Sequence, residues 1–91
     1  MEKPVLFFSD ECPDTAPFVA ELKRLGAEYE EVEVKSSQAN FKRFVLLRDR
    51  HSAFDAVKAA GKIGFPALLL EGDRVVLDLA ELESIFAAHG V

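Results

Sequence analysis

The residues best suited to chemistry lie around the single cysteine of the chain, Cys12, which directly precedes Pro13. Proline is tolerated at the first helical position, because the N–H group that it lacks has no intrahelical partner there. The pair therefore predicts a helix that begins at Pro13, with Cys12 at or beside the N-cap. Free backbone N–H groups and the helix dipole favour a thiolate at that place. We expect the Cys12 sulfur to act as a nucleophile; an inert, packed cysteine is the alternative.

The charges near Cys12 oppose this effect. Asp10 and Glu11 precede the cysteine and Asp14 follows it, and negative charge disfavours a thiolate. The dipole is worth about 0.3–1 kcal/mol, and three carboxylates together are able to cancel it, so the sequence leaves the balance open. Thr15 lies three residues after Cys12, on the same side of the expected helix. We expect its hydroxyl group to donate a hydrogen bond to the sulfur.

Length and composition limit the classes of function. The 91 residues form one domain, 1–91, and the formal charge of −5 argues against nucleic-acid binding. No apolar stretch approaches the roughly 20 residues that cross a membrane, and the N-terminus does not resemble a secretory signal. His51 and His89 stand alone in sequence, which predicts two surface residues and no metal site. We expect a cytoplasmic monomer with a free thiol.

The first half of the chain predicts three elements. The apolar run 5–8 is typical of a central strand that is buried on both faces. A helix follows over 13–25 and is ended by Gly26; Pro17 within it predicts a local bend or an early irregular turn. The β-branched residues of 29–34 favour a strand near the edge of the sheet.

The second half predicts a broken helix, a hairpin and a final helix. Ser36 and Ser37 open the first helical piece, whose expected inner face has four members: Phe41, Phe44, Val45 and Leu47. Ser52 caps a short piece over 53–60 that Gly61 ends. Strands at 67–70 and 75–77 form a hairpin, and a final helix begins at 78–81 and ends at Gly90. Its expected inward residues are Leu79, Leu82, Ile85 and Phe86.

This order, β-α-β-α-β-β-α, together with Cys12-Pro13 and the segment 64–70, resembles the glutaredoxins of the thioredoxin-fold superfamily. The resemblance covers nearly the whole chain and implies a three-layer α/β/α fold with a four-stranded mixed sheet. It also implies a cis peptide bond before Pro66, which then faces the reactive sulfur. The backbone of Phe65 would pair with a bound peptide in strand fashion. Ligand-binding positions would thus be Pro13, Phe65 and Pro66, with Lys62 near a ligand carboxylate.

The chain also departs from the glutaredoxin pattern. The family has cysteine or serine where Thr15 stands, and a lysine shortly before the cysteine, where this chain has acids. The family has a pair of glycines at the place where this chain has residues 75–78. Its iron–sulfur-binding subgroup has the motif Cys-Gly-Phe-Ser at the place where this chain has residues 12–15. The resemblance therefore implies a single-thiol oxidoreductase that acts on glutathione mixed disulfides through Cys12, with glutathione as co-substrate and no tightly bound cofactor. The partners would be glutathione or protein thiols. The alternatives are a non-catalytic binding module or a thiol redox sensor.

Overall fold

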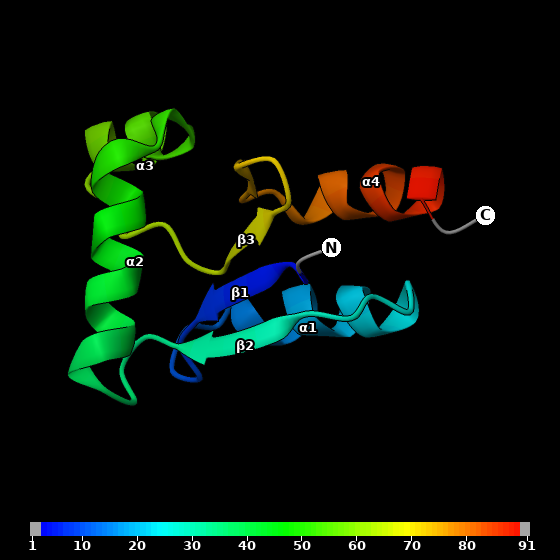
Figure 1. Ribbon diagram of the computed structural model, residues 1–91, viewed down its shortest axis with the longest axis horizontal. Helices are drawn as coiled ribbons and strands as arrows, with labels where there is room; N and C mark the ends of the chain where they lie inside the picture. Colours follow the sequence, from blue (N-terminus) through cyan, green and yellow to red (C-terminus); the bar gives the residue numbers. More distant parts are fainter. Residues whose placement is uncertain (1–2, 90–91) are drawn as a thin grey trace.

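The computed structural model describes residues 3–89. Strands and helices alternate in the first half of the chain and a hairpin precedes the last helix (Figure 1). The elements in chain order are β1 (Val5–Phe8), α1 (Thr15–Arg24), β2 (Glu30–Glu33), α2 (Gln38–Arg50), the 3₁₀ turn η1 (Ser52–Phe54), α3 (Asp55–Ala59), β3 (Ala67–Leu70), β4 (Arg74–Val76), the 3₁₀ turn η2 (Leu79–Glu81) and α4 (Leu82–His89). The expected α/β fold and element order are confirmed.

The four strands form one mixed sheet in the order β2-β1-β3-β4. β1 pairs in parallel with β2, placing Phe7 opposite Val32, and antiparallel with β3, placing Leu6 opposite Leu68. β4 returns antiparallel to β3. The apolar run 5–8 is thus a central strand and β2 is an edge strand, as predicted. The three glutamates of β2 keep this open edge polar, which discourages pairing with another chain.

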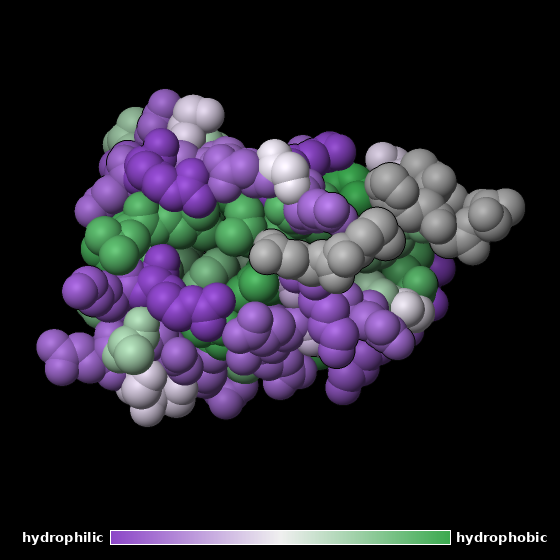
Figure 2. Space-filling model, in the orientation of Figure 1, coloured by the Kyte–Doolittle hydropathy of each residue, from purple (hydrophilic) through white to green (hydrophobic). Residues whose placement is uncertain are grey.

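Alternate residues of β1 enter two separate cores, because successive side chains of a strand point to opposite faces. Leu6 and Phe8 pack against α1 and α4, whereas Phe7 packs against α2 and η1. Figure 1 shows α2 crossing the strands steeply at one end of the sheet. On the face of the molecule drawn in Figure 2, the apolar residues form a band between two polar bands.

The steep crossing of α2 changes the inner face that the sequence predicts. Phe44 and Leu47 are buried, but Phe41 is 54% exposed and Val45 is half-buried. Only the middle turns of α2 reach the sheet, so the prediction of a buried Phe41 is wrong. Leu79 is also more exposed than predicted, because it lies in η2 and not on the inward face of α4. The predicted end at Gly90 lies outside the described residues.

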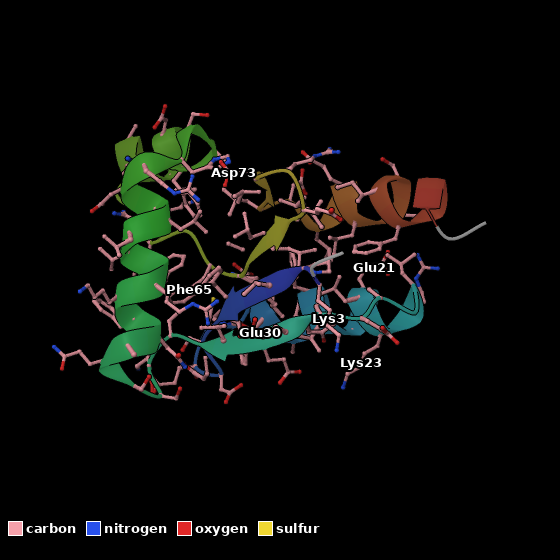
Figure 3. All side chains as sticks on the ribbon, viewed as in Figure 1. Lys3, Glu21, Lys23, Glu30, Phe65 and Asp73 are labelled. Atoms are coloured by element: carbon pink, nitrogen blue, oxygen red, sulfur yellow. The ribbon has the colours of Figure 1, made fainter. Side chains whose placement is uncertain are left out.

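His51, not Ser52, caps the short helical piece. Its Nδ1 accepts the N–H of Ala53, and its Nε2 lies 2.6 Å from the carbonyl oxygen of Asp73. The side chain is only 15% exposed, so the prediction of a surface histidine is wrong. Figure 3 shows Asp73, at the tip of the β3–β4 hairpin, beside the end of α2. His51 thus joins the hairpin to the helical layer, a contact that adjacent residues in sequence do not reveal.

Candidate active site

The loop after β1 fixes the backbone of Cys12. The N–H of Cys12 donates to the carbonyl oxygen of Ser9 at 3.1 Å, and the N–H of Thr15 donates to the carbonyl oxygen of Cys12 at the same distance. These two turns delay the helix, so α1 begins at Thr15 and Asp14 occupies its N-cap. The helix therefore starts two residues later than the predicted Pro13, and Cys12, predicted at or beside the N-cap, lies two residues before it. Cys12 lies in the turn just before the helix, with a half-buried side chain.

Pro17 does not interrupt α1, and of the two predicted irregularities, a local bend or an early irregular turn, the structure has turns directly before the helix. It occupies the third position of the helix that starts at Thr15, within the first turn. The first four N–H groups of a helix have no intrahelical acceptor, so a proline here removes no helical hydrogen bond.

The thiol of Cys12 faces the loop that leads into β3. Its Sγ atom donates to the carbonyl oxygen of Phe65 at 3.8 Å, across 53 residues of sequence. The peptide bond between Phe65 and Pro66 is cis, as predicted. Pro66 is buried and β3 starts at the next residue, beside β1. The pairing of these two strands therefore brings the cysteine and the proline loop together.

Aromatic packing holds Phe65 in this position. Figure 3 shows Phe65 between α2 and the sheet, and its ring centroid lies 5.6 Å from that of Phe44. The preceding Gly64 has φ of +105°, a backbone conformation that other residues rarely adopt. A Cβ atom at Gly64 would lie 2.8 Å from a ring carbon of Phe54. Glycine at position 64 therefore allows the proline loop to pack closely against Phe54 of η1.

Arg48 of α2 clamps the same loop. Its Nε donates to the carbonyl oxygen of Ile63 at 2.6 Å and its Nη2 to that of Lys62 at 2.8 Å. Hydrogen bonds from a charged donor are among the stronger ones in proteins. Arg48 therefore fixes the two residues that precede Gly64. Sequence analysis missed this function, because the predicted helix pattern ended before Arg48.

Thr15 does not have the predicted role toward the sulfur. Its hydroxyl group is buried and donates to the carbonyl oxygen of Ser9 at 2.7 Å. A hydroxyl group has a single proton, so this bond leaves none for Cys12. Thr15 instead stabilises the turn between Ser9 and Cys12, and the prediction that its hydroxyl group donates to the sulfur is wrong.

Lys35 brings a positive charge to the site that sequence analysis missed. It lies just after β2 and forms an ion pair with Glu11. The contact could have been predicted from the parallel pairing of β1 and β2, because the residues that follow two parallel strands meet at the same edge of the sheet. The local charge near Cys12 is thus less negative than the neighbouring residues alone indicate.

Glu33, the last residue of β2, ties this loop to the loop before Cys12. Its carboxylate accepts the N–H of Asp10 at 2.9 Å and that of Lys35 at 2.6 Å. These two bonds favour the charged form and lower the pKa of Glu33 below its ordinary value. One ionised side chain therefore bridges both loops at the edge of the sheet.

Two grooves meet at Cys12. The first groove, of about 590 Å³, runs past the proline loop toward η2, and its lining includes Lys62, Phe65, Pro66 and Asp78. The second groove, of about 660 Å³, lies between the loop and α2. Cys12, Ile63 and Phe65 line both grooves. The thiol can therefore be approached from either side of Phe65.

The predicted site residues divide between these spaces. Lys62, Phe65 and Pro66 line the first groove with Cys12, as expected for one site. Pro13 lines a third hollow, of about 510 Å³, together with Cys12 and Asp10, and is not among the residues that line the first groove. In residues 3–89 no group of three or more acidic, histidine or cysteine side chains is placed to hold a metal ion. Within the same range, no helix is both long and apolar enough to cross a membrane.

Comparison with solved structures identifies the fold. A mutant of a thioredoxin-like protein superposes with a TM-score of 0.68 at 22% identity, covering 96% of this chain and 97% of that one. The chain is a divergent thioredoxin-fold protein. A glutathione transferase homologue from Sulfitobacter with bound glutathione also aligns, with a TM-score of 0.53 and 21% identity. That alignment covers 98% of this chain but 38% of the transferase homologue.

Sequence comparison places this thioredoxin-fold protein in a narrower family. It is 57% identical over 86 residues to a Haemophilus influenzae protein described only as an uncharacterized protein. The alignment covers 94% of this chain and 100% of that protein, so the two belong to one family. No family model matches the chain.

Proposed function

We propose that this thioredoxin-fold protein is a single-thiol oxidoreductase that exchanges mixed disulfides of glutathione through Cys12. The observation that carries the proposal is the position of the Cys12 Sγ atom, 3.8 Å from the carbonyl oxygen of Phe65 at the junction of two grooves. A thiol that is half-buried but open to a groove has the access that disulfide exchange requires.

The backbone of Phe65 supports binding of an extended ligand. Within residues 3–89 its N–H makes no backbone hydrogen bond, and its carbonyl oxygen accepts only the Cys12 thiol. A peptide-like ligand laid along the loop can use both groups, as in strand addition. Glutathione is a tripeptide, and the structural neighbour from Sulfitobacter holds it.

The reaction needs one protein sulfur, the glutathione carried by the mixed disulfide and one free glutathione. The Cys12 thiolate attacks the glutathione sulfur of a mixed disulfide; a Cys12–glutathione disulfide forms, and the substrate thiolate leaves and takes up a proton. A second glutathione, as its thiolate, attacks the glutathione sulfur of this intermediate. Oxidised glutathione is released and the Cys12 thiolate returns. The chain has no second cysteine, so the resolving thiol comes from outside.

A non-catalytic binding module is the second candidate. Two carboxylates line the first groove, those of Asp14 and Asp78, and they repel the carboxylates of glutathione. Asp78 also accepts the N–H of Ala80 at 2.9 Å, so its charge is held at the groove by η2. These charges favour a module that keeps the fold but accepts a less anionic ligand.

A paired rate and binding experiment separates the two candidates. We expect the protein to accelerate exchange of the glutathione–2-mercaptoethanol mixed disulfide by glutathione, and Cys12→Ser to remove the acceleration. Amide NMR with oxidised glutathione should shift signals of 12–15, 64–67 and 75–78. A rate equal to that of free cysteine at the same concentration would overturn the oxidoreductase proposal. Shifts in Cys12→Ser with no acceleration by the wild type would favour the binding module.

A further inference from the structure

The second groove is lined by large apolar side chains that the fold itself does not need. Phe41 of α2 and Ile63 of the proline loop both line it. They are 54% and 58% exposed, whereas Phe44, which lines the same groove, is buried in the core and the half-buried Phe65 packs against that core. Water therefore covers two large apolar side chains that face one groove leading to Cys12. An apolar ligand group placed between them would remove this surface from water.

The rim of this groove carries positive charge without matching carboxylates. Arg48 lines the second groove, and Lys62, which lines the first groove, directly precedes Ile63, which lines both. Within residues 3–89 neither cation lies within 4.0 Å of a carboxylate, whereas Lys35 at the other end is paired with Glu11. The chain as a whole has a formal charge of −5, so this local excess is not a reflection of composition. An acidic group is the complement of this rim.

We propose that the second groove binds the polypeptide partner of the disulfide: an extended, acidic segment with a large apolar side chain close to its cysteine. The apolar side chain lies between Phe41 and Ile63, and an acidic residue beyond it lies near Arg48 and Lys62. Alternate side chains of an extended segment face the same way, so the apolar residue stands two positions from the cysteine. This inference rests on the proposed function and names its protein substrate class.

The exchange that uses the second groove is balanced without a further oxidant. The Cys12 thiolate attacks the peptide sulfur of a peptide–glutathione disulfide. A Cys12–peptide disulfide forms, and glutathione leaves as a thiolate that takes up a proton. Glutathione, as its thiolate, then attacks the Cys12 sulfur of this intermediate, so that a Cys12–glutathione disulfide forms and the peptide leaves as a thiolate that takes up a proton. A second glutathione thiolate attacks the glutathione sulfur of that disulfide, releases oxidised glutathione and restores the Cys12 thiolate. The first groove is free to hold the glutathione half while the second holds the peptide half.

Symmetric peptides test the preference without assuming a chain direction. The probe is the glutathione disulfide of acetyl-Asp-Phe-Ser-Cys-Ser-Phe-Asp-amide. One comparison peptide has serine in place of both phenylalanines, and the other has lysine in place of both aspartates. We expect formation of the Cys12–peptide disulfide to be about tenfold faster with the phenylalanine peptide than with the serine peptide, the usual discrimination of an apolar pocket. The lysine peptide should be slower at low salt, with a difference that falls as salt rises.

Matched variants connect this preference to the groove. Phe41→Ser and Ile63→Ser should each bring the phenylalanine-to-serine rate ratio toward one. Leu46→Ser is the control, because Leu46 is 56% exposed on the same helix but does not line the groove. Lys62→Ala should reduce the difference between the aspartate and lysine peptides. Equal rates for the phenylalanine and serine peptides, or an equal effect of Leu46→Ser, would overturn the proposal.

A binding measurement distinguishes failure of the groove from failure of the chemistry. In Cys12→Ser, the reduced phenylalanine peptide should shift the amide signals of Phe41 and Ile63 at concentrations where the serine peptide does not. If the wild type exchanges no disulfide but these shifts occur, the proposed oxidoreductase fails and the groove remains a peptide site. If exchange is fast but neither peptide moves these signals, the groove assignment fails and the oxidoreductase remains.

Discussion

The thiol of Cys12 donates to the carbonyl oxygen of Phe65 at 3.8 Å, although 53 residues separate the two in sequence. The pairing of β1 with β3 sets this distance, and packing of the Phe65 ring on Phe44 fixes the carbonyl group. The contact places a nucleophile beside the N–H of Phe65, which makes no backbone hydrogen bond within residues 3–89. It is the basis of the proposed exchange, and the predictions below concern the residues that hold it.

Thr15→Val should destabilise the fold without altering the reactivity of Cys12. The substitution removes the bond to the carbonyl oxygen of Ser9, and we expect a loss of about 1 kcal/mol in the free energy of unfolding. Urea unfolding measures the loss, with Thr15→Ser as the control that retains the hydroxyl group. The pH dependence of Cys12 alkylation should stay unchanged. A displaced alkylation profile would show that the threonine hydroxyl acts on the sulfur after all.

Gly64→Ala should cost more stability than Gly72→Ala. Both glycines have positive φ, +105° and +83°, but a Cβ atom meets the Phe54 ring at 2.8 Å only at Gly64. We expect an additional loss of about 1–3 kcal/mol at Gly64, the usual cost of overpacking. Thermal or urea unfolding of the two variants measures the difference. Equal losses would mean that the Phe54 ring moves aside freely.

His51→Ala should destabilise the fold more than Arg50→Ala, although both side chains contact Asp73. His51 is 15% exposed and bonds two backbone groups, so we expect a loss of about 1–3 kcal/mol. The Arg50–Asp73 ion pair is exposed, and screening by solvent leaves such pairs with little effect on the free energy of unfolding. Urea unfolding at constant pH ranks the two variants. The reverse order would contradict the structural role of His51.

The Glu33 carboxylate should make stability depend on acid pH. Its pKa is lowered in the folded state by the N–H groups of Asp10 and Lys35. The stabilisation is therefore complete above the ordinary glutamate pKa of about 4.3, and is lost as the pH falls through the lowered folded value. Glu33→Gln should remove this part of the acid dependence in urea unfolding between about pH 6 and pH 3.

Glu31→Gln is the matched control for this experiment. Glu31 is an exposed residue of the same strand, and within residues 3–89 its side chain makes no hydrogen bond. The acid dependence of the control should follow that of the wild type. If both variants lose the same stability in acid, the two backbone bonds of Glu33 do not contribute as the structure indicates.

The sequence by itself determined the elements of this protein and their order. Apolar runs, β-branched residues and glycines at positive φ are local signals, so strands 5–8 and 67–70 begin and end as predicted. Gly26 and Gly61 end their helices for the same reason. The cis bond before Pro66 came from the resemblance to a known family, which a local pattern alone does not supply.

The tertiary structure decided which residues share the site, because side-chain partners depend on strand pairing and on helix crossing angles. Thr15 bonds to Ser9 and not to the sulfur, since two turns displace the helix start past Cys12. Lys35 and Arg48 reach the site from segments far away in sequence. Phe41 faces a groove rather than the core because α2 crosses the sheet steeply. The distances between residues of different elements are set only when the helices pack against the sheet.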